Sequence, residues 1–548
     1  MNVKSVCLNG GVWNNSLTFA TVFFKICLRD MKNFRICLLS FLLTATTSSV
    51  MAGGILTNTN QSIDFLRNPA RDAAIGIDGV YSNPAGVAFL GEGFHLGINW
   101  QYAHQTRTIA STDDVFKYGK KNNGQTTKTF VGEADAPVIP SLQAAWNKGD
   151  WSLQFNFSIP GGGGKCEFAD GLGSFERKVG EIATSFMGID QLAGTLNAVT
   201  GSTIPANGTT GYNMDSYMEG RQYYYGFQLG TAYKINEQLS VYGGLRLLVG
   251  NATYKARISN IQVRTADADQ DFAKFLPKVS QQVSQLMPVA TNVLTGLKTK
   301  EAAGVALSAD ELKLKGAIES LAEKQANGQL AALSKYSEGV NLLCNQSGMG
   351  IAPIIGVDYK LGQFNFAAKY EFKTQVRMKN ESTVFQASEI EAVNKYRDEE
   401  EVDEDAPALL TLGAQWSPSD QVRLNLGGHY FFDKDAKWYN NSQTLLSHNT
   451  YEVLAGVEWD VTDRMTISAG GQMTRYGLTD EYMNDMSFVV NSISYGFGCN
   501  YKATDKLVLK LGYFQTDYDD YTRQTSATVA DSFTRTNRVL GLGCEVTL

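Results

Sequence analysis

Histidine and proline are scarce in this chain, and long apolar runs are absent from most of it. The 548 residues contain 4 histidines and 11 prolines. No run of about 18 apolar residues occurs after residue 52, which argues against transmembrane helices. The histidines, His95, His104, His429 and His448, show no zinc-ligand spacing. We therefore expect no metal site and no cofactor.

An excess of positive charge is also missing. The formal net charge is −7, so the chain lacks the basic footprint of a nucleic-acid-binding protein. A barrel enzyme such as an outer-membrane protease or phospholipase needs a Ser/His or Asp/His constellation. His95 and His429 fall singly in inward register, which is typical of wall residues. We expect no enzymatic activity and no catalytic residue.

What the chain has instead is an alternation of apolar and polar residues with period two. Leu540, Leu542, Cys544 and Val546 alternate with glycines, Glu545 and Thr547 up to the last residue. Period two indicates β-strands, and fourteen stretches show it. Apolar outer faces and polar inner faces over an even number of strands predict an all-β membrane fold, a 14-stranded antiparallel transmembrane barrel.

The expected strands are recognised by alternation and by the turn residues that bound them. They cover residues 93–105, 141–147, 151–159, 222–234, 239–255, 350–359, 364–376, 408–416, 422–432, 450–460, 465–475, 490–501, 506–515 and 538–548.

Short turns and long loops alternate between these stretches, which in this class places the turns in the periplasm and the loops outside. At least one aromatic residue stands at a strand end beside each of the six short turns, as an interfacial girdle requires. A soluble sandwich or propeller does not explain this alternation. The girdle residues are Trp146, Trp151, Tyr233, Tyr359, Trp416, Trp459 and Tyr501.

The N-terminus has the features of an export signal. Lys32 and Arg35 follow Met31, an apolar stretch comes next, and small residues precede Gly53. We interpret residues 1–52 as a leader whose true start is Met31, with a signal peptide over 31–52. The alternative is one long signal anchor. Cys166 and Cys344 lie in long loops, and export to an oxidising compartment makes a disulfide between them possible.

Two of the long loops have helical periodicity. Ser174 is a candidate cap for one helix, Pro288 is expected to end a second, and Ser308 with Glu311 forms a capping box before a third. The apolar faces of these helices either pack on each other as a loop core or form an external groove for an apolar ligand. The groove candidates are Phe186, Phe272, Phe275 and Val279.

Several charged residues fall in inward register. They either pair with one another along the wall, or Arg246 or Arg423 binds a substrate carboxylate. An acidic run over residues 398–405 is expected to be a solvated loop, and divalent cations bridging it to lipopolysaccharide are an alternative.

Residues 53–91 precede the first strand and are rich in small residues, with an Asn83-Pro84-Ala85 turn. This segment resembles the N-terminal hatch of FadL-type outer-membrane transporters of long-chain fatty acids and aromatic hydrocarbons, and the resemblance extends to the strand count and the C-terminal last strand. It implies a leader over 1–52, a hatch or plug over 53–91 and a barrel over 92–548.

The resemblance also implies a function. An apolar ligand would be captured between external loops, pass to a site beside the hatch and leave sideways at an inward kink in the third strand. In that family the motif matched by Asn83, Pro84 and Ala85 contacts the kink. The expected partners are the apolar ligand, outer-membrane lipid and lipopolysaccharide, with the chain a monomer in the outer membrane. A polar-solute porin, or a structural or adhesive barrel, is the alternative.

Overall fold

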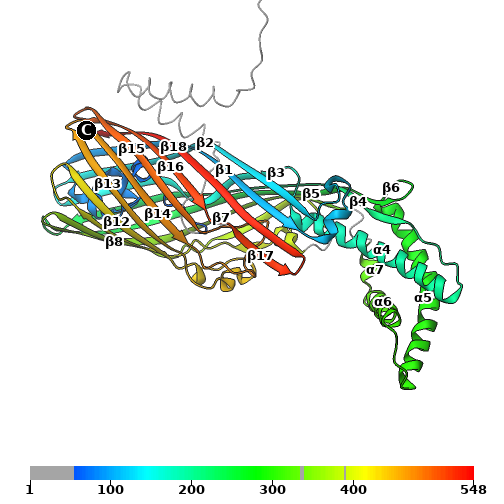
Figure 1. Cartoon of the computed structure of the whole chain (residues 1–548). Helices are drawn as coiled ribbons and strands as arrows, with labels where there is room; N and C mark the ends of the chain where they lie inside the picture. The colour runs from blue at the N-terminus through cyan, green and yellow to red at the C-terminus, as the bar shows by residue number, and fades with distance from the viewer. Residues whose placement is uncertain (1–54, 334–338, 388–390) are drawn as a thin grey trace, which may run out of the picture.

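The computed structural model describes residues 55–333, 339–387 and 391–548. The expected leader over 1–52, its start at Met31 and the mature start at Gly53 lie outside these residues. The described strands, eighteen in number, belong to one sheet whose ladders are antiparallel and which closes where β1 pairs with β18 (Figure 1).

Among the described residues, fourteen of these strands build the barrel, which confirms the predicted fold. They are β1 (Gly93–Thr112), β2 (Thr127–Lys148), β3 (Trp151–Phe168), β4 (Thr209–Lys234), β5 (Leu239–Thr265), β7 (Val340–Leu361), β8 (Phe364–Glu371), β11 (Leu409–Trp416), β12 (Val422–Phe431), β13 (Tyr451–Thr462), β14 (Met465–Arg475), β15 (Ser492–Thr504), β16 (Leu507–Tyr518) and β18 (Val529–Thr547).

Four additional strands prolong the wall on the loop side. β6 (Asp269–Asp271) pairs with β5, β9 (Arg377–Ala387) with β7, β10 (Glu401–Asp403) with β9, and β17 (Tyr521–Ser526) with β18. Three residues of the acidic run thus form a strand, so the expected solvated loop over 398–405 is only partly present.

The predicted strands are accurate at their turn-side ends. At the loop-side ends they are too short for β1 to β5, β7, β16 and β18, whereas β8 was expected to reach residue 376 and ends at Glu371. β2 was expected from residue 141 and begins at Thr127, and β4 was expected from 222 and begins at Thr209. Above the membrane neither face needs a continuous apolar surface, so the alternation fades although the backbones remain paired. Apolar periodicity therefore reports where the membrane is, not where the strand ends.

The outer surface carries an apolar belt. Leu229, Ile351 and Leu426 are 59%, 59% and 61% exposed. The predicted girdle is confirmed as exposed, from Tyr233 at 37% to Trp151 at 59%. So much apolar surface is stable only against lipid, which agrees with the expected outer-membrane location. Among the described residues, no helix is long and apolar enough to cross a membrane.

The described helices lie in the N-terminal segment and in the connections on the loop side (Figure 1). They are α3 (Ile63–Arg67), η2 (Ile77–Val80), η3 (Gly86–Phe89), η4 (Asp114–Tyr118), η5 (Lys120–Asn122), α4 (Gly173–Thr200), α5 (Phe272–Ala302), α6 (Ala309–Ala326), α7 (Gln329–Ala332), η7 (Glu391–Tyr396), η8 (Asp433–Asp435) and η9 (Tyr439–Leu445).

The expected helix ends are right in one case and wrong in two. The capping box of Ser308 and Glu311 is present at the start of α6. α4 begins at Gly173 instead, and Ser174 does not cap it. α5 continues through Pro288 because its apolar face is buried against α4 and α6, which offsets the hydrogen bond lost at the proline.

Residues 55–91 run through the interior of the barrel, toward its turn end (Figure 1). The part around α3 follows the inner wall, where inward glycines leave room for it. A Cβ on Gly541 would stand 2.5 Å from Ile63 Cδ1, and one on Gly496 would overlap the Leu66 carbonyl oxygen. We call these glycines the glycine track: Gly413, Gly427, Gly456, Gly470, Gly496, Gly498, Gly512, Gly541 and Gly543.

The glycine track predicts a difference between inward and outward glycines. Gly496→Ala should lower the free energy of unfolding by about 1–3 kcal/mol, because the new methyl group overpacks the segment. Gly428→Ala is the control, since its Cβ would lie 3.8 Å from the Glu452 carbonyl oxygen. Urea unfolding of refolded protein measures both variants. Equal stability of the two would contradict the packing described here.

Candidate functional site: the lumen segment and the gap in the barrel wall

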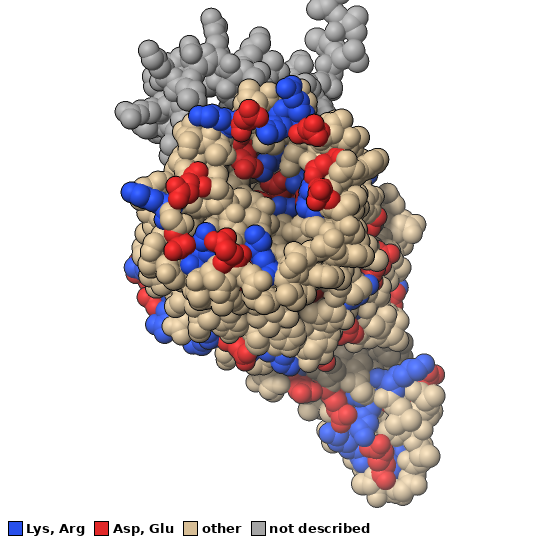
Figure 2. All heavy atoms as spheres, turned by 90° about the vertical axis from the view of Figure 1, so that its left-hand side faces the viewer, with Lys and Arg blue, Asp and Glu red and all other residues tan. Residues whose placement is uncertain are grey.

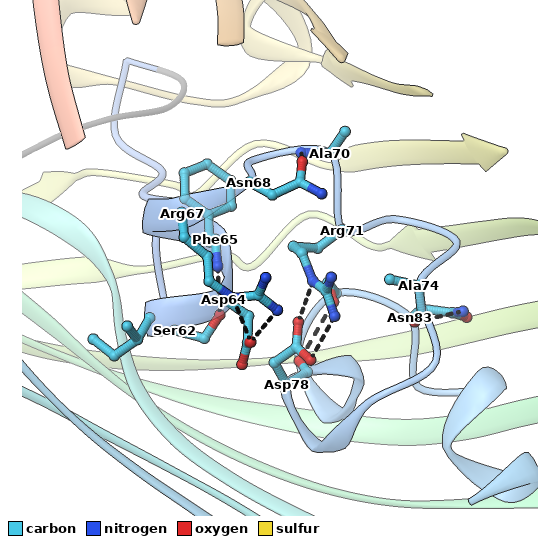
Figure 3. A network of polar contacts seen from close by, with 12 residues as sticks. Ser62, Asp64, Phe65, Arg67, Asn68, Ala70, Arg71, Ala74, Asp78 and Asn83 are labelled. Carbon is cyan, nitrogen blue, oxygen red and sulfur yellow. Dashed lines mark hydrogen bonds and ion pairs between the residues drawn. The ribbon is translucent and has the colours of Figure 1, made fainter. Parts of the chain in front are cut away.

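A layer of buried charges ties the lumen segment to the turn-side half of the barrel. Arg67 contacts Asp64 at 2.7 Å (Figure 3). Arg67 also contacts Glu458 at 2.7 Å, and Lys510 contacts Asp64 at 2.5 Å and Glu545 at 2.9 Å. Burial raises the pKa of Asp64, but the cations of Lys510 and Arg67 outweigh it and hold the pKa well below its ordinary value. Asp64 is therefore a charged anchor.

A second group of pairs continues the layer. Arg71 points at Asp78, with nitrogen–oxygen distances of 2.8 and 3.0 Å (Figure 3). Arg71 also reaches Glu458 at 3.0 Å. Arg423 of β12 bonds to Glu458 and to both oxygens of Asp460. Figure 2 looks at this end of the barrel, where acidic and basic side chains surround a hollow. We call these pairs, with those of Asp64, the charge layer.

A third contact joins the segment to the wall through a histidine. His429 Nε2 lies 3.0 Å from Asp72 Oδ1, and His429 Nδ1 lies 2.7 Å from Glu452 Oε2. All three side chains are at least 95% buried. A carboxylate only accepts hydrogen bonds, so both ring nitrogens must donate, which suits the imidazolium cation. His429 is thus a positive bridge between two buried carboxylates.

The two carboxylate-binding candidates are both engaged by the protein itself. Arg246 lies 2.5 Å from Glu371, 2.6 Å from Gln228 and over the ring of Tyr81. Among the described residues, its Nε has no hydrogen-bond partner. Arg423 is held by the charge layer. Arg423 therefore belongs to a network of paired wall charges, which was the alternative to carboxylate binding. Arg246 is also paired, but its Nε has no partner.

The Asn83-Pro84-Ala85 turn contacts three barrel strands. Asn83 Nδ2 donates to Asp358 of β7 at 2.6 Å. The Pro84 carbonyl accepts from Gln154 of β3 at 2.7 Å, and the Ala85 carbonyl accepts from Ser240 of β5 at 2.7 Å. The motif thus touches the third strand, on the turn side of its irregular region.

The irregular region of β3 is at its glycine run. In the described sheet, β2 and β3 pair from Leu142 with Phe157 to Lys148 with Trp151, and again at Gly132 and Glu133. Residues 134–141 of β2 and 158–166 of β3 do not pair with each other. Gly162 and Gly164 have φ of 96° and 73°, a conformation that favours glycine. The sequence located the glycine run but not the loss of pairing.

The lumen segment occupies this gap. Asn58 N donates to the Pro160 carbonyl at 2.9 Å, and Asn58 Nδ2 donates to the Gly162 carbonyl at 3.1 Å. Gln61 behaves like a strand neighbour: its Nε2 donates to the Ile159 carbonyl, and its Oε1 accepts from Ile159 N, both at 3.0 Å. We call this contact the gap seal. Sequence reasoning missed Asn58 and Gln61, because no local pattern marks a side chain that replaces a strand.

Apolar side chains surround the gap seal. Ala136, Ile139 and Ile159 from the two unpaired stretches form one buried cluster with Tyr223 of β4 and Phe65 of the segment. An apolar molecule at this height would meet apolar walls, whereas the charge layer lies on the turn side of it.

The groove candidates lie in the loop core. Phe186, Phe272, Phe275 and Val279 are at most 3% exposed and pack in one cluster of α4, α5 and α6. Of the four, only Phe272 also lines an apolar pocket, which is small in this structure, with a volume of about 20 Å³. The packed loop core expected as the alternative is what the structure has, with this pocket at its base.

The expected disulfide between Cys166 and Cys344 is wrong, and both thiols are free. Both residues lie on strands, where Cys166 pairs with Gly220, Gly220 with Tyr254, and Tyr254 with Cys344. Three strand spacings of about 4.8 Å separate them, roughly 14 Å in all. A disulfide needs Cα atoms within about 7 Å.

Comparison with solved structures identifies the architecture. The structure of a Pseudomonas aeruginosa FadL homologue superposes with a TM-score of 0.55 at 11% identity, covering 90% of this chain and all of that one. The chain has the FadL-type fold. The resemblance inferred from the sequence is thereby confirmed for the fold.

Two other solved structures have lower scores. The P. putida toluene transporter TodX gives a TM-score of 0.46 at 14% identity, covering 86% of this chain and 94% of its own. The Ralstonia pickettii toluene transporter TbuX gives 0.44 at 13%, covering 88% and 98%. No family model and no curated protein matches the sequence.

The histidine bridge predicts a large stability effect. His429→Leu leaves Asp72 and Glu452 buried without their cation, so it should lower the free energy of unfolding by about 3–5 kcal/mol. His104→Leu is the control, because His104 pairs with Asp135 on an exposed surface, where such pairs contribute under about 1 kcal/mol. Urea unfolding in detergent measures both, and similar losses would show that the bridge is not what holds the segment.

Proposed function

We propose that the chain takes up apolar small molecules across the outer membrane and releases them sideways through the gap in β3. One observation carries this proposal: a stretch of wall without pairing between β2 and β3, flanked by a cluster of apolar side chains and sealed by hydrogen bonds from the lumen segment. The fold shared with the FadL homologue supports it. The proposal involves no chemical reaction, and the chain acts as a transporter.

Capture would begin outside the membrane. The apolar pocket beneath α4 and α5 is the entry site that we propose, with Phe272, Ile261 and Val340 in its lining. Phe186, Phe275 and Val279 would act indirectly, by supporting the helices that frame it. A ligand that buries one or two apolar groups there gains about 1.5–3 kcal/mol for each.

The exit must avoid the charge layer. An apolar molecule that passed straight to the turn end would have to displace buried ion pairs and would contribute no hydrogen bonds in return. A sideways route through the gap meets the apolar cluster, the buried hydroxyl groups of Ser141 and Ser158 and the neutral hydrogen bonds of Asn58 and Gln61, but none of the ion pairs of the charge layer. In this scheme residues 53–91 are a hatch whose first described residues move, while the part held by charges stays in place.

The porin alternative requires an open aqueous lumen. The buried segment and its ion pairs argue against one. We also propose that the chain is a monomer surrounded by outer-membrane lipid. Uptake of a fatty acid, an uncharged hydrocarbon and a small sugar by the same cells separates the two functions. Protein-dependent uptake of the sugar alone would favour the porin.

Gln61 should control the gap. Gln61→Ala removes both hydrogen bonds to Ile159, so local opening at the gap should become easier and deuterium exchange at the Ile159 backbone amide should speed up about tenfold. Gln154→Ala is the matched control, since it removes one glutamine bond between the segment and β3 outside the gap. If Gln154→Ala speeds exchange at the Ile159 amide as much as Gln61→Ala does, the gap seal is not the gate.

Arg246 should discriminate between ligands. Its Nε is buried and unpaired in this structure, and we propose that it donates to an acidic head group when a ligand enters. Arg246→Ala should then reduce fatty-acid uptake about tenfold, as expected for loss of a charged hydrogen bond. Uptake of an uncharged hydrocarbon should not change, and Arg246→Lys should restore part of the fatty-acid uptake. A parallel loss for both ligands would mean that Arg246 only maintains the wall.

A further inference from the structure

Four basic side chains gather on the outer surface of the wall, on the loop side of the apolar belt. Lys165 of β3 pairs in register with Arg221 of β4, and Lys255 and Arg257 follow on β5, all outside. All four are partly or fully exposed. We call them the outer cation patch.

The outer cation patch lies at the height of the lipid head groups. Phe227 and Leu247, on the same two strands, face outward and are 40% and 38% exposed. Arg221 follows Phe227 on the loop side by six residues, which at 3.3 Å per residue and a tilt near 40° is about 15 Å along the barrel axis. The patch therefore stands just beyond the hydrocarbon layer.

The charges of the patch are not balanced locally. Lys165 pairs with Glu167 and Glu219, at 2.8 and 3.4 Å, and Lys255 pairs with Glu219 at 3.1 Å. Within the described part of the chain, neither Arg221 nor Arg257 forms an ion pair, and the printed side-chain bond of Arg221 goes to the neutral hydroxyl of Thr253. Two guanidinium groups thus face the surroundings in a chain whose net charge is −7.

Another sector of the wall lacks this excess. Arg377 pairs with Glu401 and Asp403, and Lys379 pairs with Glu399. Positive charge at this height is therefore not a general property of the surface.

We propose that the outer cation patch binds the phosphate groups of lipopolysaccharide. The lipid of the outer leaflet carries phosphates at the edge of its hydrocarbon, and a guanidinium group matches a phosphate with two parallel hydrogen bonds. Bound in this way, a lipopolysaccharide molecule needs no divalent cation to attach to the protein. Because Lys165 directly follows Gly164, the bound lipid would lie beside the gap in β3.

The test uses the full-length protein, stripped of lipid in detergent and titrated with purified lipopolysaccharide. Native mass spectrometry counts the lipids bound to each barrel. The double variant R221Q/R257Q should bind lipopolysaccharide about tenfold more weakly than the wild type, from the usual contribution of basic residues at an anionic lipid surface. The control R377Q/K379Q, which removes two outward cations from the other sector, should bind within about twofold of the wild type.

Two further arms identify the chemical group. The wild type should bind enzymatically dephosphorylated lipid as weakly as R221Q/R257Q does, and inorganic phosphate at the same concentration should not displace lipopolysaccharide. Equal binding of lipopolysaccharide by the wild type and R221Q/R257Q would overturn the proposal, as would equal binding of the dephosphorylated lipid. Full displacement by inorganic phosphate would indicate a simple anion site instead. None of these outcomes depends on the transported ligand.

Discussion

The structure depends on one constraint: irregular backbone at the depth of a membrane must find its hydrogen bonds inside the protein. A 14-stranded barrel is wider than its own side chains can fill, and here the lumen segment fills it. Its carbonyl groups accept hydrogen bonds from wall side chains that point inward. Donors to the segment's carbonyls include Gln101, Ser141, Asn147, Gln154, Gln228, Ser240, Asn365 and Lys369.

The same constraint makes the gap and the segment depend on each other. Where β3 leaves β2, its backbone groups lose their partners, and Asn58 and Gln61 supply new ones. The glycine track brings the next part of the segment close enough to the wall to hold this position. The gap between β2 and β3 can therefore exist in the membrane because the lumen segment supplies hydrogen-bond partners for the unpaired backbone groups.

The sequence predicted the features that face the lipid, and it missed most of the contacts between the lumen segment and the inner wall. Alternation gave the strands, the girdle gave the turn-side ends, and the Asn83-Pro84-Ala85 turn indicated a packed segment. The inward glycines make room for the lumen segment. The residues that they contact are far away in the sequence, so no local pattern could reveal this role. The same holds for His429, whose role requires Asp72, a residue 357 positions away. The position of Cys166 on a strand was missed because the alternation had already faded there.

The energies of the two attachments decide which part of the segment can move. The gap seal consists of a few neutral hydrogen bonds, each with a net value of about 0.5–1.5 kcal/mol, and water or a ligand can replace some of them. The charge layer and the His429 bridge consist of buried ion pairs, and separating even one costs about 3–5 kcal/mol. Withdrawing the whole segment would break several such pairs together, more than the binding of one apolar molecule supplies. A shift confined to the residues around Asn58 and Gln61 breaks only a few neutral hydrogen bonds, and the free energy of binding one apolar molecule can offset their loss. We therefore expect the segment to open at the barrel wall and to stay closed along the barrel axis.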